Sequence, residues 1–142
     1  MIFRRAFLVL FVLSLIIPGV EARPQEGQRT EGDATLSTFE DLAYPATARV
    51  ARVQGVVVVE VKLDDKGNVV SASALSGPKP LIADSVSNAK KWKFKANFRK
   101  AAIIVYEFRL DDGACHDASH SLFLLRYPNF ATITACTPVI SG

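Results

Sequence analysis

The chain has 142 residues, with 17 Lys and Arg against 14 Asp and Glu and a formal net charge of +3. This length suits one domain with a modest core and is too short for two. Because positive and negative charges nearly balance, the composition argues against nucleic acid as a partner. Any basic stretch must therefore be judged as a local feature.

The N-terminus has the pattern of a secretory signal peptide. Arg4 and Arg5 precede an apolar run over residues 6–20, and short residues follow at the positions that a signal peptidase reads. We predict that residues 1–22 are removed and that the mature chain starts at Arg23. The alternative is an uncleaved membrane anchor, but a spanning helix needs roughly 20 apolar residues, and a Pro-Gly pair interrupts this run.

The first ordered pattern after the signal begins at Phe39. Residues 23–38 are polar and poor in large apolar side chains, which predicts a flexible leader before a domain over residues 39–142. Tyr44 precedes a proline and so avoids helical backbone, whereas Pro45 suits the first turn of a helix. We therefore expect a short helix over residues 46–53.

Alternating side chains then predict a β-hairpin. Gly55 precedes a valine-rich strand that is predicted over residues 57–63. Its odd-numbered residues are all apolar, whereas the even-numbered ones become polar toward the end of the strand, at Glu60 and Lys62. The sequence DDKGN supplies turn residues, with Gly67 able to adopt positive φ. The return strand is predicted over residues 69–76.

A second helix is predicted over residues 81–93. Ile82, Val86, Ala89 and Trp92 recur at the spacing of one helical stripe, so we expect Trp92 in the core. In this prediction the lysines at 90, 91 and 93 occupy the last helical turn, where cations favour the negative end of the helix dipole.

A third strand and a C-terminal hairpin complete the prediction. Alternation indicates a strand over residues 102–110, and two further strands over 122–127 and 130–136 form a hairpin that begins from about residue 114. Cys115 and Cys136 flank the hairpin, and export favours a disulfide between them over two free thiols. The expected fold is α+β, with a small antiparallel sheet packed with two helices.

These residues resemble the C-terminal domain of the TonB family. The shared features are Tyr44-Pro45 before a short helix, Gly55 before a valine-rich strand, Gly67 in the hairpin and the run Trp92-Lys93-Phe94 after the second helix. The resemblance covers residues 39 to about 110. It implies the same fold and a location in the periplasm of a Gram-negative cell envelope.

The resemblance also implies a partner. The family's energy transducers join an inner-membrane motor to outer-membrane receptors, and a receptor peptide adds as a strand beside the third strand of the domain. Whether the C-terminal hairpin covers that edge stays open at this point. The residues expected to bind the partner here are Ile103, Ile104, Val105, Tyr106, Glu107, Phe108 and Arg109.

The segment CHDASH, residues 115–120, raises the question of a metal site. His116 and His120 are four residues apart, so a helical segment would place both on one face. We predict a polar loop instead, because zinc sites usually supply three or four ligands and an oxidised cysteine is not a ligand. The sequence also contains no GxSxG elbow and no Gly-rich phosphate loop. We therefore predict no enzymatic activity, no metal and no cofactor.

The basic and aromatic stretch over residues 94–100 supports a second functional hypothesis. Lys95, Arg99 and Lys100 are suited to lipopolysaccharide phosphates or peptidoglycan carboxylates, which would make the domain an envelope-surface binding module. We prefer the simpler interpretation that this stretch is a solvated connector with Phe94 and Phe98 in the core. The leading hypothesis remains a domain that binds a protein or peptide.

Overall fold

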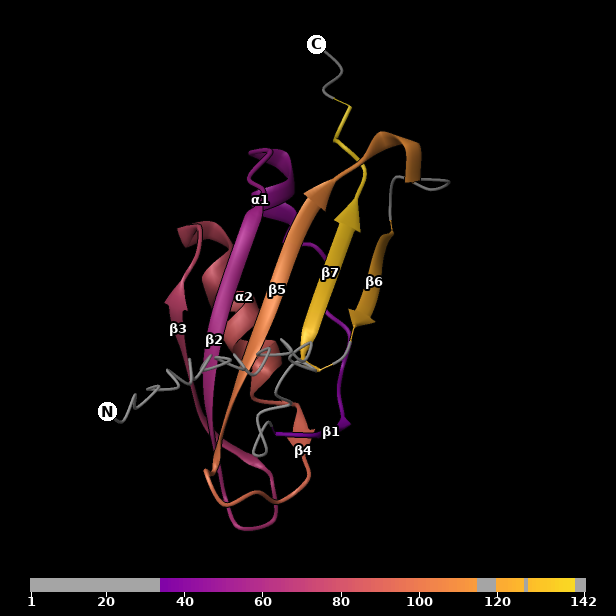
Figure 1. Cartoon of the computed structure of the whole chain (residues 1–142). Helices are drawn as coiled ribbons and strands as arrows, with labels where there is room; N and C mark the ends of the chain where they lie inside the picture. Colours follow the sequence, from indigo (N-terminus) through magenta and orange to yellow (C-terminus); the bar gives the residue numbers. More distant parts are fainter. Residues whose placement is uncertain (1–33, 115–119, 127, 140–142) are drawn as a thin grey trace, which may run out of the picture.

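The structure is a computed structural model that describes residues 34–114, 120–126 and 128–139 (Figure 1). It confirms the predicted α+β class, with a five-stranded sheet in the order β3-β2-β5-β7-β6 and a two-stranded sheet of β1 and β4. The elements are β1 (Leu36–Thr38), α1 (Ala46–Val50), β2 (Gly55–Leu63), β3 (Val69–Ser76), α2 (Lys79–Ala89), β4 (Lys93–Phe94), β5 (Ala101–Leu110), the short 3₁₀ helix η1 (Asp112–Ala114), β6 (Ser121–Arg126) and β7 (Phe130–Ala135).

Strands β3, β2 and β5 form antiparallel pairs, as predicted. β2 lies between the other two, with Val59 opposite Ala74 on one side and opposite Ile104 on the other. The odd-numbered residues Val57, Val59 and Val61 are buried beneath α2, which packs on one face of the sheet (Figure 1). Alternation with period two therefore places every second β2 residue in the core.

The C-terminal hairpin joins the sheet through a parallel pair. β6 and β7 pair antiparallel with each other, as predicted, but β7 runs parallel to β5. The chain leaves β5, passes down the outermost strand β6 and returns as β7 between them, so β7 has the direction of β5 (Figure 1). The sheet is therefore mixed, and the prediction of a purely antiparallel sheet is corrected.

The second helix ends earlier than predicted. α2 stops at Ala89, and the backbone N–H groups of Lys91 and Trp92 bond three residues back, to the carbonyls of Asn88 and Ala89. The tighter turn leads directly into β4, so the lysines follow the helix and do not occupy its last turn. Their predicted place in the last helical turn is therefore wrong, and Lys90 is the C-cap residue. The last residues of the predicted leader also differ, because they form β1 and pair with β4.

A buried amide connects the helix to the sheet beneath it. Trp92 is 1% exposed, which confirms its predicted place in the core, and its Nε1 donates to Asn88 Oδ1 at 2.9 Å. The Tyr106 hydroxyl donates to the same oxygen at 2.9 Å. Asn88 Nδ2 in turn donates to the carbonyls of Glu40 and Asp41, both at 3.1 Å. One side chain thus joins α2, β5 and the segment before α1.

Candidate functional site

Tyr44 and Pro45, the first motif residues, hold the entry to the domain in place. The Tyr44 hydroxyl donates to the Val53 carbonyl at 2.6 Å, and its ring meets Phe108 edge-on with centroids 5.4 Å apart. Burial raises the pKa of Tyr44, because it disfavours the ionised phenolate. The Tyr44 backbone N–H donates to Ser121 Oγ at 3.1 Å, which ties the entry to β6.

The motif glycines mark close approaches of the chain. Gly67 has φ +83°, and a Cβ there would collide with the Phe94 carbonyl oxygen. The Phe94 backbone N–H donates to the Gly67 carbonyl at 2.9 Å, so the hairpin turn rests directly on β4. Gly55 has φ +141°, and a Cβ there would lie 2.8 Å from Pro78 Cγ. Together with buried Trp92 and Phe94, these glycines let separate parts of the chain approach each other closely.

Much of the predicted partner-binding edge is covered. β7 pairs with β5 from Val105 to Leu110, and the backbone N–H groups of Val105 and Asp111 donate to the Asn129 and Ala135 carbonyls, both at 3.0 Å. The prediction of an edge strand is therefore wrong for Val105 to Arg109, because the hairpin occupies the place where a partner strand would pair. Ile104, Tyr106 and Phe108 also point into the core.

The start of β5 is different, because the pairing with β7 begins only at Val105. Backbone groups alternate along a strand, so those of Ala101 and Ile103 point to the same side as those of Val105. No strand in the described part of the chain pairs with them there. The Ile103 side chain is also 42% exposed. The region Ala101–Ile104 is therefore the open end of the predicted edge, and we call it the open segment of β5.

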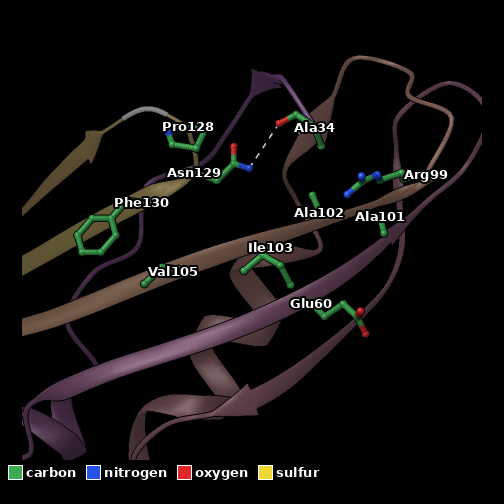
Figure 2. A pocket seen from close by; sticks show the side chains of 10 residues that line it. All are labelled: Ala34, Glu60, Arg99, Ala101, Ala102, Ile103, Val105, Pro128, Asn129 and Phe130. Atoms are coloured by element: carbon green, nitrogen blue, oxygen red, sulfur yellow. Dashed lines mark hydrogen bonds between the residues drawn. The ribbon is translucent and has the colours of Figure 1, made fainter. Parts of the chain in front are cut away.

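A groove of about 380 Å³ lies beside the open segment. Figure 2 shows its walls, which come from the start of β5, the turn between β6 and β7, and the residue before β1. The lining residues are Ala34, Glu60, Arg99, Ala101, Ala102, Ile103, Val105, Pro128, Asn129 and Phe130. The groove is mostly apolar, and its polar lining residues are Arg99, Asn129 and Glu60, the last of which lies on β2 opposite Ile103.

Asn129 is the buried polar residue of this groove. It is 8% exposed, its Nδ2 donates to the Ala34 carbonyl at 3.4 Å, and its Oδ1 has no hydrogen-bond partner among the described residues. The sequence analysis did not single out Asn129, which resembles any turn residue after a proline. Its place beside β5 follows only from the parallel pairing of β7.

The basic and aromatic stretch is divided between core and surface. Phe94 is buried, as predicted, whereas Phe98 is 78% exposed, so the prediction that it packs in the core is wrong. The Arg99 guanidinium lies 5.8 Å from the centroid of the Phe98 ring. Lys100 pairs with Asp65 at 2.6 Å, and this hydrogen bond raises the pKa of Lys100. Phe98 is exposed because it lies in the turn between β4 and β5, beyond the sheet.

Several predictions fall on residues outside the described ranges. These include the signal peptide, most of the leader, and Cys115, His116 and Asp117, so the disulfide to the buried Cys136 stays a prediction. Across residues 34–114, 120–126 and 128–139, no group of three or more His, Cys, Asp or Glu is placed to hold a metal ion. Within the same ranges, no helix is long and apolar enough to cross a membrane.

Comparison with known proteins agrees with the motif. The family model described as Gram-negative bacterial TonB protein C-terminal matches residues 40–110, which is half of the 142-residue chain. No curated protein and no solved structure matches the chain. The matched region contains α1, β2, β3, α2, β4 and β5 and ends at the last residue of β5, before η1 and the covering hairpin. The chain therefore belongs to the family of TonB C-terminal domains.

Proposed function

We propose that this TonB-like domain binds a protein partner in the periplasm through a peptide that adds as a strand to the open segment of β5. Membership of a family of non-enzymatic interaction domains supports this function. The family role suggests an outer-membrane receptor as the partner and transmembrane transport as the process. The proposed site is shorter than the predicted edge, because the hairpin restricts the peptide to Ala101–Ile104.

One observation carries the proposal: the outward backbone groups of Ile103, beside a mostly apolar groove, pair with no strand in the described part of the chain. An exposed edge strand presents N–H and C=O groups that another chain can pair with. Strand addition draws its affinity from such backbone bonds and its specificity from neighbouring pockets. The open segment spans about 13 Å, enough for a peptide of about four residues.

Two variants at one position test strand addition. In Ile103→Pro the backbone N–H is lost, yet no bond to β2 is broken, because that N–H points away from β2. In Ile103→Val the N–H and most of the apolar surface are retained. Binding would be followed by nuclear magnetic resonance with synthetic peptides from the periplasm-facing N-terminal segments of outer-membrane receptors of the same cell.

We expect peptides to shift the Ile103 amide in the unmodified protein and in Ile103→Val, and Ile103→Pro to weaken binding at least about tenfold. Both variants should keep the circular dichroism spectrum of the unmodified protein. Equal binding by the proline variant, or peptide-induced shifts confined to β3 or β6, would place the contact elsewhere and contradict the proposal.

A second candidate is the envelope-surface binding module. The observation in its favour is the exposed Phe98 ring with Arg99 stacked on it, next to the exposed Lys95. An aromatic ring flanked by cations is suited to the phosphate and sugar surface of lipopolysaccharide. Phe94 is buried and Lys100 is paired with Asp65, so the patch is smaller than the sequence suggests.

Replacement of Lys95, Arg99 and Lys100 by Gln separates the two candidates. Surface binding would lose its affinity for lipopolysaccharide and peptidoglycan in sedimentation assays, whereas the Ile103→Pro variant would bind these polymers normally. If the triple replacement leaves sedimentation unchanged, the surface hypothesis is wrong.

A further inference from the structure

β6 forms one outer edge of the five-stranded sheet. It pairs with β7 on one side, and no strand in the described part of the chain lies on its other side (Figure 1). An exposed edge strand offers its backbone N–H and C=O groups to any chain that can pair with them. Natural edges are usually protected by bulges, prolines or charged side chains, and the two edges of this sheet differ in this respect.

The opposite edge, β3, carries such protection, whereas β6 does not. The register of β3 with β2 shifts twice, and Ser71 and Ser73 are exposed along it. β6 pairs with β7 in one continuous register, contains no proline and has one charged residue, Arg126, at its end. On the helix-free face of β6, Leu122 and Leu124 are 53% and 48% exposed. β6 therefore has the character of a strand that another strand covers.

The direction of the backbone groups along β6 follows from the bonds between β5 and β7. The Asn129 and Ala135 carbonyls accept from N–H groups at β5, so the odd-numbered residues of β7 present their backbone groups to β5 and the even-numbered ones present theirs to β6. Those even-numbered residues pair with the even-numbered residues of β6. The backbone groups on the outer side of β6 therefore belong to Ser121, Phe123 and Leu125.

β6 is complementary to a second copy of itself. In an antiparallel pair centred on Phe123, Leu122 lies opposite Leu124 of the second copy, and the outer backbone groups of the two strands face each other. Apolar side chains then meet on both faces of the joined sheet. On the helix side, Phe39 stacks on Phe123 with ring centroids 5.8 Å apart and is 44% exposed, so it extends the apolar surface beside the edge.

The charges around this edge are few and do not oppose the pairing. In this register Arg126 lies opposite His120 of the second copy, beyond the end of the strand. On the helix-free face, the adjacent strand β7 contributes Phe130 and two threonines. On the helix side, the segment that packs under β6 brings Glu40, which pairs with a lysine at 2.9 Å, and Asp41. An edge of this kind fits a second copy better than a strongly charged partner.

We propose that two copies of the chain associate through β6, antiparallel about a two-fold axis, so that their sheets join into one continuous sheet. β6 follows the region that matches the family model, and this surface is separate from the open segment of β5. An edge of six residues, about 20 Å long, is a small interface, so we expect a dissociation constant in the micromolar range.

Sedimentation equilibrium of the chain purified from the periplasm, between about 5 and 500 μM, tests the association. Leu124→Lys places a cation opposite an apolar side chain and near its own counterpart across the axis, so we expect at least about tenfold weaker association. The matched control is Leu75→Lys on β3, where the leucine is 58% exposed, and it should leave the dissociation constant unchanged. Both variants should keep the circular dichroism spectrum of the unmodified protein.

A pair of opposite charges tests the register. Leu122→Glu alone should weaken association as Leu124→Lys does. In the double variant each introduced carboxylate lies opposite an introduced ammonium group, so we expect the dissociation constant to return to within about threefold of that of the unmodified protein. A double variant that associates as weakly as the single ones would overturn the register centred on Phe123.

Amide hydrogen exchange locates the contact in the unmodified protein. Protection of the Phe123 amide should rise with protein concentration, whereas the Leu122 amide, which faces β7, should be protected at every concentration. A chain that stays monomeric at about 500 μM, or a dimer that Leu124→Lys leaves intact, would overturn the inference. A dimer that Ile103→Pro weakens in its place would move the contact to the open segment of β5 and would also overturn it.

Discussion

The two ends of β5 share one strand and one alternating pattern but differ in what lies beside them. From Val105 to Leu110, β7 pairs with the strand, whereas Ala101–Ile104 has a groove on that side. Both ends place their even-numbered side chains in the same core. The core is therefore not what decides whether the edge is accessible.

The comparison shows that the hairpin after the family-matched region covers one side of β5 from Val105 onward and leaves the start of the strand without this cover. The family match ends at residue 110, and the hairpin that covers the edge follows it. The hairpin is joined to the family-matched part by the hydrogen bond between Tyr44 and Ser121 as well as by β7. The hairpin leaves Ala101–Ile104 of β5 uncovered on that side. The following substitutions test this difference between the two ends of the strand.

The largest effect is expected when the packing of β7, which covers one side of β5, is disrupted. Ile133 of β7 is fully buried, so Ile133→Ala should lower the free energy of unfolding by about 2–5 kcal/mol. Amide exchange of Glu107 should also become faster, because β7 holds that side of β5. Urea unfolding and hydrogen exchange provide the measurements. The control is Leu124→Ala on exposed β6, and similar losses in both variants would show that β7 does not anchor the hairpin.

A substitution between β2 and β3 tests the stability of the family-matched region, to which the hairpin is joined. Gly67→Ala forces a Cβ into the Phe94 carbonyl at a positive φ, and we expect a loss of about 2–4 kcal/mol in urea unfolding. Gly113→Ala is the matched control, since a Cβ there meets only Asp111 Oδ1 at 3.4 Å. If Gly67→Ala is as stable as the control, the turn does not rest on β4 as described.

Tyr106 lies beneath the covered end of β5 and gives a pH-dependent prediction. Burial raises its pKa above the usual value, so its neutral form is favoured in the folded state. The stabilisation is complete below about pH 10, where the unfolded phenol ionises, and is lost as the pH rises further, by about 1.4 kcal/mol per pH unit. Tyr106→Phe should cost about 1–2 kcal/mol at pH 7, because Asn88 Oδ1 loses a donor.

The alkaline slope separates this cause from a general loss of packing. Between pH 10 and 11, the free energy of unfolding of Tyr106→Phe should fall less than that of the unmodified protein, by about 1 kcal/mol, because the unfolded phenol goes from about half to about nine-tenths ionised. Denaturant titrations at fixed pH provide the measurement. Identical slopes in the two proteins would mean that Tyr106 ionises as an ordinary exposed phenol.

How much of this could be predicted from the sequence depends on how local each signal is. Trp92, Gly67 and the β2–β3 hairpin are specified by patterns over a few residues, and the structure confirms them. The end of α2 was misplaced because Trp92 continues the helical spacing, although it reaches the core through a tighter turn after Ala89.

The candidate site could be predicted only in part. Ile103 was among the predicted edge residues, but the covering of Val105 to Leu110 depends on the order β5-β7-β6, which no local pattern encodes. Asn129 lies beside β5 because of the same parallel pairing. Phe98 was misassigned because the strand that follows it starts at Ala101, which leaves its ring beyond the sheet.

The smallest expected effect concerns the outer face of the covered end. Thr132 Oγ1 of β7 donates to Glu107 Oε2 of β5 at 3.3 Å, on a face that is only partly buried. Thr132→Val keeps the shape and removes this bond, so we expect a loss below about 1 kcal/mol in thermal unfolding. Thr134→Val is a suitable comparison in the same strand. A loss above about 2 kcal/mol would mean that this pair, and not the buried Ile133, holds β7 to β5.

The most direct test of the central claim is amide hydrogen exchange at Ile103 and Glu107 in the same protein at neutral pH. Both N–H groups point away from β2, so the comparison isolates what lies on the other side of β5. We predict that Glu107 is protected by the pairing with β7 and that Ile103 exchanges at least about a hundredfold faster. Equal protection of the two amides would show that the open segment is covered as well and would contradict the account.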